Sequence, residues 1–265
     1  MSNFVSRLIV SAIGLPLVLG LAWIGGWWLF ALALVAALVA AHEFWLLARA
    51  VQPLAPAGYI GVVLAIAGAE AGGVRWMVGG VVVSVVLSFA LKVVSDTRTA
   101  ATIAVSGTVL VAAWIGLGVG FLVLVREIPE HGRLAIFTVL LAVWAGDTLA
   151  YLGGRLVGRH KMAPSTSPGK TWEGFVFGSA ATIFVAFVAL YKSDFLSVPE
   201  SVILGAALAL AAPAGDLFES LLKRDMDVKD SGRLLGGHGG MLDRIDALLF
   251  AAPTAYYCIA AFGHA

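Results

Sequence analysis

The chain has 265 residues, of which 60% are hydrophobic and only 12% are charged. A soluble globular domain carries roughly 25% charged residues, so this composition excludes an ordinary soluble fold and predicts an all-α polytopic integral membrane protein. The net charge of +1 gives no sign of a nucleic-acid partner, and the lone cysteine, Cys258, excludes an internal disulfide.

Apolar runs follow one another along the chain, and they predict a single membrane domain over residues 1–265 with about nine transmembrane helices and no soluble domain. The third run is the weakest, because it approaches the roughly 20 residues of a membrane helix only if it continues to Val74. The first run follows Arg7 like a signal peptide, but no clear cleavage site follows it, so we expect a retained helix. The runs cover residues 8–24, 27–47, 58–74, 76–94, 101–125, 134–152, 175–191, 198–214 and 245–262.

Polar residues concentrate in two segments, which we call the first polar island (residues 147–174) and the second polar island (residues 213–246). The first island begins at Asp147, a carboxylate inside an apolar run, where an ionisable group is costly and usually has a partner or a function. A basic loop follows and ends in Ser-Pro-Gly-Lys-Thr, which contributes Ser167 and Lys170. Such a loop can also simply hold anionic lipid head groups.

The second polar island combines carboxylates and cations with a glycine-rich loop. If its first part is helical, Asp216, Ser220 and Lys223 lie on one face. Glycines let backbone N–H groups approach a phosphate closely. Asp243 and Asp246 then lie one turn apart at the start of the last apolar run. This pattern favours a site for Mg²⁺ and a polyphosphate, and the alternative is a solvated loop with ordinary charge pairs.

Both islands resemble sequence blocks of the phosphatidate cytidylyltransferase (CDP-diacylglycerol synthase) family. The first island is similar to a block in which Asp-Thr-x-Ala-Tyr leads through a basic loop to Ser-Pro-x-Lys-Thr-x-Glu-Gly. The second is similar to the family signature, which runs from a serine and Lys-Arg through Lys-Asp and His-Gly-Gly to Asp-Arg-x-Asp, without a departure. The signature residues are Ser220, Lys223, Arg224, Lys229, Asp230, Gly232, His238, Gly239, Gly240, Asp243, Arg244 and Asp246.

The resemblance implies an enzyme that joins CTP to phosphatidate and releases CDP-diacylglycerol and pyrophosphate for phospholipid biosynthesis. It also implies Mg²⁺ as cofactor, with room for a second cation, membrane lipids as surroundings, and a homodimer. A lipid phosphate is already an anion, so the reaction needs metal ions and fixed cations more than a general base.

On this basis we assign roles to residues of both islands. The expected metal ligands are Asp216, Asp243 and Asp246. The expected catalytic set adds Ser220, Lys223 and Arg224 to these aspartates. The expected nucleotide-binding residues are Ser167, Lys170, Lys229, Gly237, His238, Gly239 and Gly240.

Two residues keep two interpretations each. His238 either bonds a phosphate or the leaving group, or only fixes the glycine loop. Glu43, at the end of the second apolar run, is either functional or an ordinary polar helix end.

The lysines and arginines indicate the orientation in the membrane. With nine spans, thirteen of the seventeen lie on one side together with both polar islands, and the positive-inside rule places that side in the cytoplasm. Without the islands, four cations remain on each side, so the orientation depends on the islands themselves. We therefore expect one cytoplasmic-side site formed by both islands, in a bacterial inner membrane.

Two other functions fit parts of this pattern. A CTP-dependent polyprenol or related lipid kinase would also bind a nucleotide at the membrane, but it would release CDP rather than pyrophosphate. A transporter would place polar groups near the middle of the bilayer, whereas only Asp147 lies clearly within an apolar run.

Overall fold

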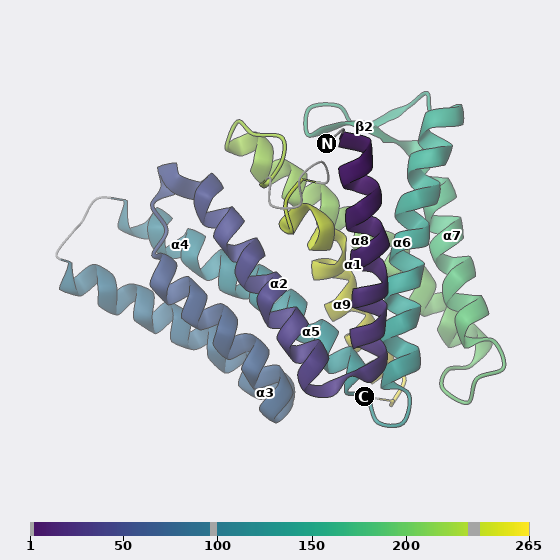
Figure 1. The fold of residues 1–265 in the computed structure, drawn as a ribbon, viewed down its shortest axis with the longest axis horizontal. Helices are drawn as coiled ribbons and strands as arrows, with labels where there is room; N and C mark the ends of the chain where they lie inside the picture. The colour runs from purple at the N-terminus through teal and green to yellow at the C-terminus, as the bar shows by residue number, and fades with distance from the viewer. Residues whose placement is uncertain (1–2, 96–99, 233–238, 265) are drawn as a thin grey trace. The chain divides into compact units, whose positions relative to one another are not determined.

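The computed structural model describes residues 3–95, 100–232 and 239–264, and most of them are helical (Figure 1). They form two compact units. Unit 1 comprises Met1–Leu124 and Met226–Ile245, and unit 2 comprises Val125–Asp225 and Asp246–Ala265. Whether these units act as the single predicted domain stays a prediction.

Unit 1 is built from the N-terminal helices. The first two are joined at Gly25, whose φ of 73° lies in the left-handed region that suits glycine. The α3 helix packs against α2, and the T-shaped contact between Trp45 and Tyr59, with ring centroids 5.8 Å apart, joins the end of α2 to the start of α3. Its elements are α1 (Asn3–Ile24), α2 (Gly26–Leu47), η1 (Ala48–Val51), α3 (Ala55–Val94), α4 (Ala101–Val111), η2 (Ala112–Gly116) and α5 (Leu117–Arg126), which ends in unit 2.

The α3 helix is a hairpin of two helical halves. Gly73, with φ of 72°, and the glycine before it have non-helical backbone angles. A methyl group on Gly68 would lie 2.5 Å from the Trp76 carbonyl oxygen, and one on Gly61 would lie 2.5 Å from Ser84 Cβ. The halves therefore pack antiparallel at very short range. They correspond to the third and fourth predicted apolar runs, and the break between them falls near the predicted boundary.

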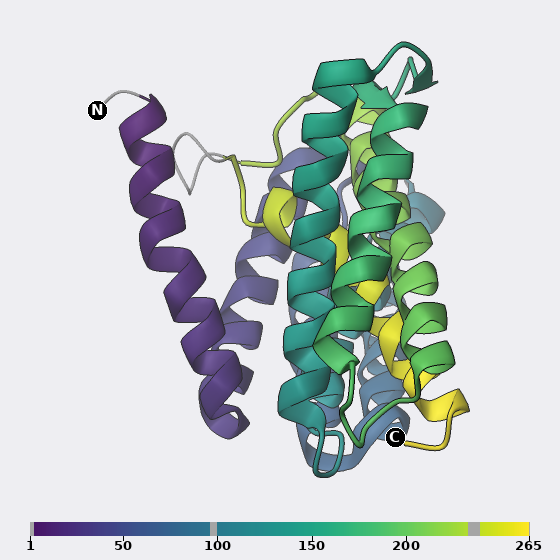
Figure 2. The same cartoon turned by 90° about the vertical axis from the view of Figure 1, so that its right-hand side faces the viewer.

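Unit 2 is a helical bundle with one short hairpin at its end. The helices α6, α7 and α8 lie side by side (Figure 2). In the hairpin, β1 and β2 are antiparallel, with Lys161 opposite Thr171 and Ala163 opposite Ser167. The elements are α6 (Gly132–Val157), β1 (Lys161–Ala163), β2 (Ser167–Thr171), α7 (Trp172–Leu190), α8 (Val198–Asp225) and α9 (Leu242–Ala261), which begins in unit 1.

Among the described residues, six helices are long and apolar enough to cross a membrane: α2, α3, the continuous stretch Ala101–Arg126, α6, α7 and α8. The prediction of an all-α membrane protein is therefore confirmed, apart from the small β hairpin. The count of about nine crossings stays a prediction.

Candidate functional site

The polar face of α8 forms as the spacing of its residues predicts. Ser220 Oγ donates a hydrogen bond of 3.3 Å to Asp216 Oδ1, one turn earlier. Above this face lies Lys170 from β2, whose Nζ is 2.8 Å from Asp216 Oδ2 and donates at 3.5 Å to the carbonyl of Pro213. A cation of the first polar island is therefore paired with a carboxylate of the second.

A second contact joins the two islands at the end of α8. Arg224 Nε donates a hydrogen bond of 3.2 Å to the carbonyl oxygen of Thr166, in the turn of the β hairpin. Ser167 is the next residue, half-buried at the start of β2. Within unit 2, the hairpin is therefore held against α8 at both Asp216 and Arg224.

Local hydrogen bonds hold the hairpin between α6 and α7. Thr171 caps α7, because its Oγ1 accepts from Gly174 N at 3.1 Å. The Glu173 carboxylate accepts the backbone N–H groups of Arg159 and His160, and Glu173 Oε1 lies 2.6 Å from His160 Nδ1. Glu173 thus fixes the basic loop after α6. These hydrogen bonds indicate a structural role for Glu173, which is one of the residues of the family block.

Four carboxylates gather where α8 packs on α9. Asp246 is only 9% exposed, and the charges that act on it come from Asp216, Glu219 and Asp147. The helices approach closely here, because a methyl group on Gly215 would lie 2.5 Å from the carbonyl oxygen of Asp246. We call Asp147, Asp216, Glu219 and Asp246 the carboxylate cluster.

Two lysines pair with members of this cluster. Lys170 pairs with Asp216, and Lys223 Nζ lies 2.6 Å from Glu219 Oε2. Acidic groups gather around the buried Asp246, and the repulsion between them would be compensated by a bound cation. Buried charges need such compensation, so the residues present fit a hard cation.

The carboxylates alone do not form a closed metal cage. Throughout the described parts of the chain, no three His, Cys, Asp or Glu side chains are arranged to hold a metal ion. Mg²⁺ is commonly bound by only one or two carboxylates, with water and substrate phosphates as the remaining ligands. The arrangement therefore suits a cation that arrives with a polyphosphate.

Glu219 is a member of the cluster that sequence reasoning missed. It is 1% exposed and forms a buried ion pair with Lys223, one turn later. A carboxylate four residues before a lysine on a helix is a recognisable pairing signal, but on sequence alone it does not distinguish a buried pair from a surface pair. Asp147 stood out as an acid in an apolar run, and the structure gives it Asp246 as an electrostatic neighbour.

In unit 1, Asp243 binds the backbone of the second island. Its Oδ2 accepts from Gly240 N at 2.7 Å, and both carboxylate oxygens accept from Ser231 N, at 3.2 and 3.1 Å. Gly239 has φ of 82°, a left-handed conformation that favours glycine. Asp243 thus caps the start of α9, and its predicted metal ligation stays a prediction.

Glu43 of α2 binds the same backbone from another helix. It is 4% exposed, and its two oxygens accept from Met241 N and Leu242 N, each at 2.9 Å. Ser231 Oγ also donates to Glu43, at 3.2 Å. Of the two interpretations that the sequence left open, a merely polar helix end does not describe this buried carboxylate.

Three predicted nucleotide-binding residues remain to be placed: Lys229, Gly237 and His238. Lys229 is exposed in the segment after α8. Gly237 and His238 lie outside the described residues, so the two interpretations of His238 both stay open.

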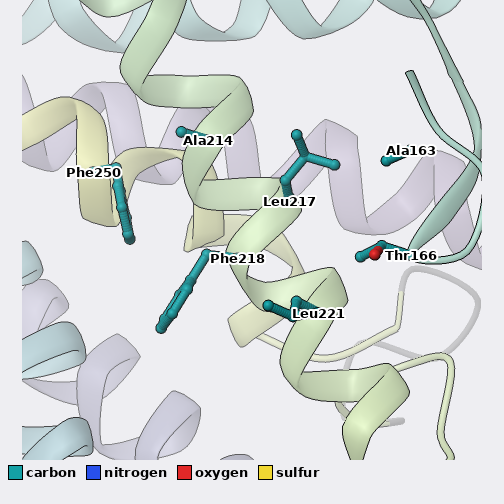
Figure 3. Close-up of a pocket in the computed structure, with 7 residues that line it drawn as sticks. All are labelled: Ala163, Thr166, Ala214, Leu217, Phe218, Leu221 and Phe250. Carbon is teal, nitrogen blue, oxygen red and sulfur yellow. The ribbon is translucent and has the colours of Figure 1, made fainter.

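An apolar groove lies beside the polar face of α8. It has a volume of about 360 Å³, and its lining is almost wholly apolar (Figure 3). Leu217, Phe218 and Leu221 supply its α8 side, and Thr166 lies at the hairpin side. The full lining is Ala163, Thr166, Ala214, Leu217, Phe218, Leu221 and Phe250. One helix thus presents charged groups on one face and an apolar groove on another.

Comparison with known proteins agrees with the resemblance seen in the two islands. The model of the cytidylyltransferase family matches residues 5–262. The phosphatidate cytidylyltransferase of Mycobacterium bovis is 36% identical over 270 residues, which cover 92% of this chain and 84% of the relative. That of Bacillus subtilis is 38% identical over 155 residues, which cover 58% of this chain and 57% of the relative. That of Haemophilus influenzae is 42% identical over 134 residues, which cover 49% of this chain and 46% of the relative.

Proposed function

The chain belongs to the cytidylyltransferase family, and we propose that it is a membrane-embedded phosphatidate cytidylyltransferase whose reacting groups gather in unit 2. The protein transfers the CMP moiety of CTP to phosphatidate, giving CDP-diacylglycerol and pyrophosphate. The observation that carries the site assignment is the pairing of Lys170 with Asp216, which brings together the two polar islands.

The reaction sets the requirements that these residues meet. An oxygen of the phosphatidate phosphate attacks the α-phosphorus of CTP, the bond from that phosphorus to the bridging oxygen breaks, and pyrophosphate leaves with the electron pair. Two anions must approach, and charge builds on the leaving group, so fixed cations stabilise the transition state. Lys170 and Lys223 are such cations, each held by a carboxylate at the polar face of α8.

We assign Mg²⁺ to Asp216 and Asp246 of the carboxylate cluster. When bound, Mg²⁺ neutralises phosphate charge and aligns the two anions. Asp246 is buried among the other carboxylates and Asp216 lies on the facing helix, so a cation held by both acids would offset the repulsion between them. Ligation by Asp243, and a second cation, stay predictions of the sequence.

The apolar groove is assigned to an acyl chain of phosphatidate. Its volume of about 360 Å³ falls within the range of ligand pockets, roughly 300–1,000 Å³. Thr166 lines the groove and also accepts a hydrogen bond from Arg224. An acyl chain in the groove would therefore place its glycerol phosphate near Arg224.

For the membrane arrangement, the proposal includes nine crossings, with α1, α9 and each half of α3 as separate spans and the stretch from α4 to α5 as one. Exposed tryptophans support a boundary at one end of unit 1, because Trp27 and Trp28 lie at the α1–α2 turn and Trp76 lies at the tip of the α3 hairpin. Tryptophan is enriched at membrane–water interfaces. The site then faces the cytoplasm, where CTP is available, and a homodimer remains part of the proposal.

The purified protein tests this function with labelled CTP and phosphatidate in mixed micelles, with and without Mg²⁺. We expect CDP-diacylglycerol and pyrophosphate in equal amounts, only with the metal present. Release of CDP with a phosphorylated lipid would instead identify a lipid kinase. Solute uptake into sealed vesicles without a nucleotide would favour the transporter.

A further inference from the structure

Glu43 is a buried carboxylate for which the transfer reaction itself provides no role. It lies near the end of α2 and accepts two consecutive backbone N–H groups, those of Met241 and Leu242, at the start of α9. These N–H groups have no partner within their own helix, and the N-terminus of a helix attracts negative charge. Glu43 therefore serves as an N-terminal cap supplied by a different helix.

The same carboxylate also holds the residue at which the glycine-rich segment begins. Ser231 Oγ donates to Glu43 at 3.2 Å, while Ser231 N donates to Asp243. Charge-assisted hydrogen bonds of this kind are roughly twice as strong as neutral ones. Glu43 of α2 and Asp243 of α9 thus both bind Ser231, and Glu43 also binds the N–H groups at the start of α9.

Two glycines leave room for Glu43. A methyl group on Gly232 would lie 2.6 Å from Glu43 Oε1. A methyl group on Gly240 would collide with Glu43 Oε2 and with Ser231 Oγ. Glycine at these two signature positions is therefore explained by the approach of the carboxylate, independently of any contact with a phosphate.

We propose that Glu43 is a positioning residue for the reaction, which anchors Ser231 and the first turn of α9 to α2 and thereby holds Asp246 in place for Mg²⁺. Asp246 lies in α9, one turn after Asp243. Rotation or fraying of the first turn of α9 would change the direction of the Asp246 carboxylate. This inference rests on the proposed function, because it takes Asp246 as a metal ligand.

The test uses Glu43→Gln in the full-length protein, with His42→Gln as its matched control. Glutamine keeps the size of the side chain but presents an amide N–H₂ where a carboxylate oxygen accepted a backbone N–H. His42 is the neighbouring residue in α2, and it is exposed and hydrogen-bonded to Tyr59 OH at 3.0 Å. Both variants are compared with the unaltered protein by thermal unfolding in detergent.

The first readout is hydrogen exchange at the amides of Met241 and Leu242, without substrate. Glu43→Gln is expected to speed exchange there about tenfold, because each amide loses a charged acceptor. The second readout is the Mg²⁺ concentration for half-maximal activity at saturating CTP. We expect it to rise about tenfold while kcat at saturating Mg²⁺ stays within about twofold, and His42→Gln should change neither value.

Unchanged exchange at Met241 and Leu242 would overturn the anchoring role. Faster exchange with an unchanged Mg²⁺ requirement would overturn the link to the reaction. If Glu43→Gln does not fold, Ser231→Ala carries the test, because it removes one hydrogen bond to Glu43. It should raise the exchange rate at Met241 and Leu242, and the Mg²⁺ concentration for half-maximal activity, each about threefold. Failure of the proposed function would appear separately, as an unaltered protein that makes no CDP-diacylglycerol.

Discussion

Lys223 Nζ lies 2.6 Å from Glu219 Oε2, and only 1% of the Glu219 side chain is exposed. Removing one partner of such a pair leaves a buried charge uncompensated, whereas replacing both is often nearly neutral for stability. We therefore expect Glu219→Gln to lower the free energy of unfolding by about 3 kcal/mol. The double variant Glu219→Gln, Lys223→Met should recover most of that stability but not activity. Equal activity in the double variant and the unaltered protein would contradict the role of Lys223.

Asp246→Asn tests the metal assignment. The substitution preserves size but removes the charge that Mg²⁺ requires, so we expect at least a roughly hundredfold loss of CTP-dependent product in a folded protein. Asp227→Asn is the matched control, because Asp227 is exposed and its positive φ of 55° suits asparagine. Near-normal turnover of folded Asp246→Asn at ordinary Mg²⁺ concentrations would remove Asp246 from the metal site.

Lys170→Met tests the contribution of the first polar island. Loss of this cation leaves Asp216 without its 2.8 Å partner and removes a positive charge from the phosphates of CTP. A charged hydrogen bond is worth roughly 1.5–3 kcal/mol, so kcat/KM for CTP should fall about tenfold to hundredfold. Lys161→Met, an exposed lysine in β1 of the same hairpin, should have little effect. Similar losses in both variants would indicate a general effect of positive charge instead.

Filling the apolar groove tests the acyl-chain assignment. Leu221→Trp adds bulk at the groove wall, so the KM for long-chain phosphatidate should rise several-fold, whereas the KM for dihexanoyl phosphatidate should stay nearly constant. Leu210→Trp adds the same bulk to α8 at an exposed position outside the groove and is the control. Equal effects on short and long chains would place the acyl chain elsewhere.

Local patterns in the sequence predicted much of this arrangement. The spacing of Asp216, Ser220 and Lys223 indicated one helical face, and the helix forms with the Ser220–Asp216 hydrogen bond in place. Helical periodicity depends on residues within two turns of each other, so a single sequence suffices to recognise it. The composition likewise predicted an all-α membrane protein, because the share of apolar residues depends on whether a chain lies in lipid or in water and not on how its helices pack.

Long-range partners could not be predicted in this way. Glu43 and Leu242 are separated by 199 positions, and nothing near either residue indicates the other. The family blocks led us to expect that the two islands meet, but not that Lys170 pairs with Asp216 or Arg224 with the Thr166 carbonyl. The β hairpin was also missed, because β1 has only three residues and β2 contains proline and glycine without an alternating apolar pattern.

The close packing of α6 on α7 has a consequence for interpreting mutational surveys. A methyl group on Gly178 would lie 2.8 Å from both Ala150 Cβ and the Gly146 carbonyl oxygen. A larger residue there would wedge apart the helix that carries Asp147 and the one that directly follows Lys170, without altering either side chain. Inactive variants along this seam would therefore report a changed spacing between reactive groups, and they would not by themselves mark residues that take part in the chemistry.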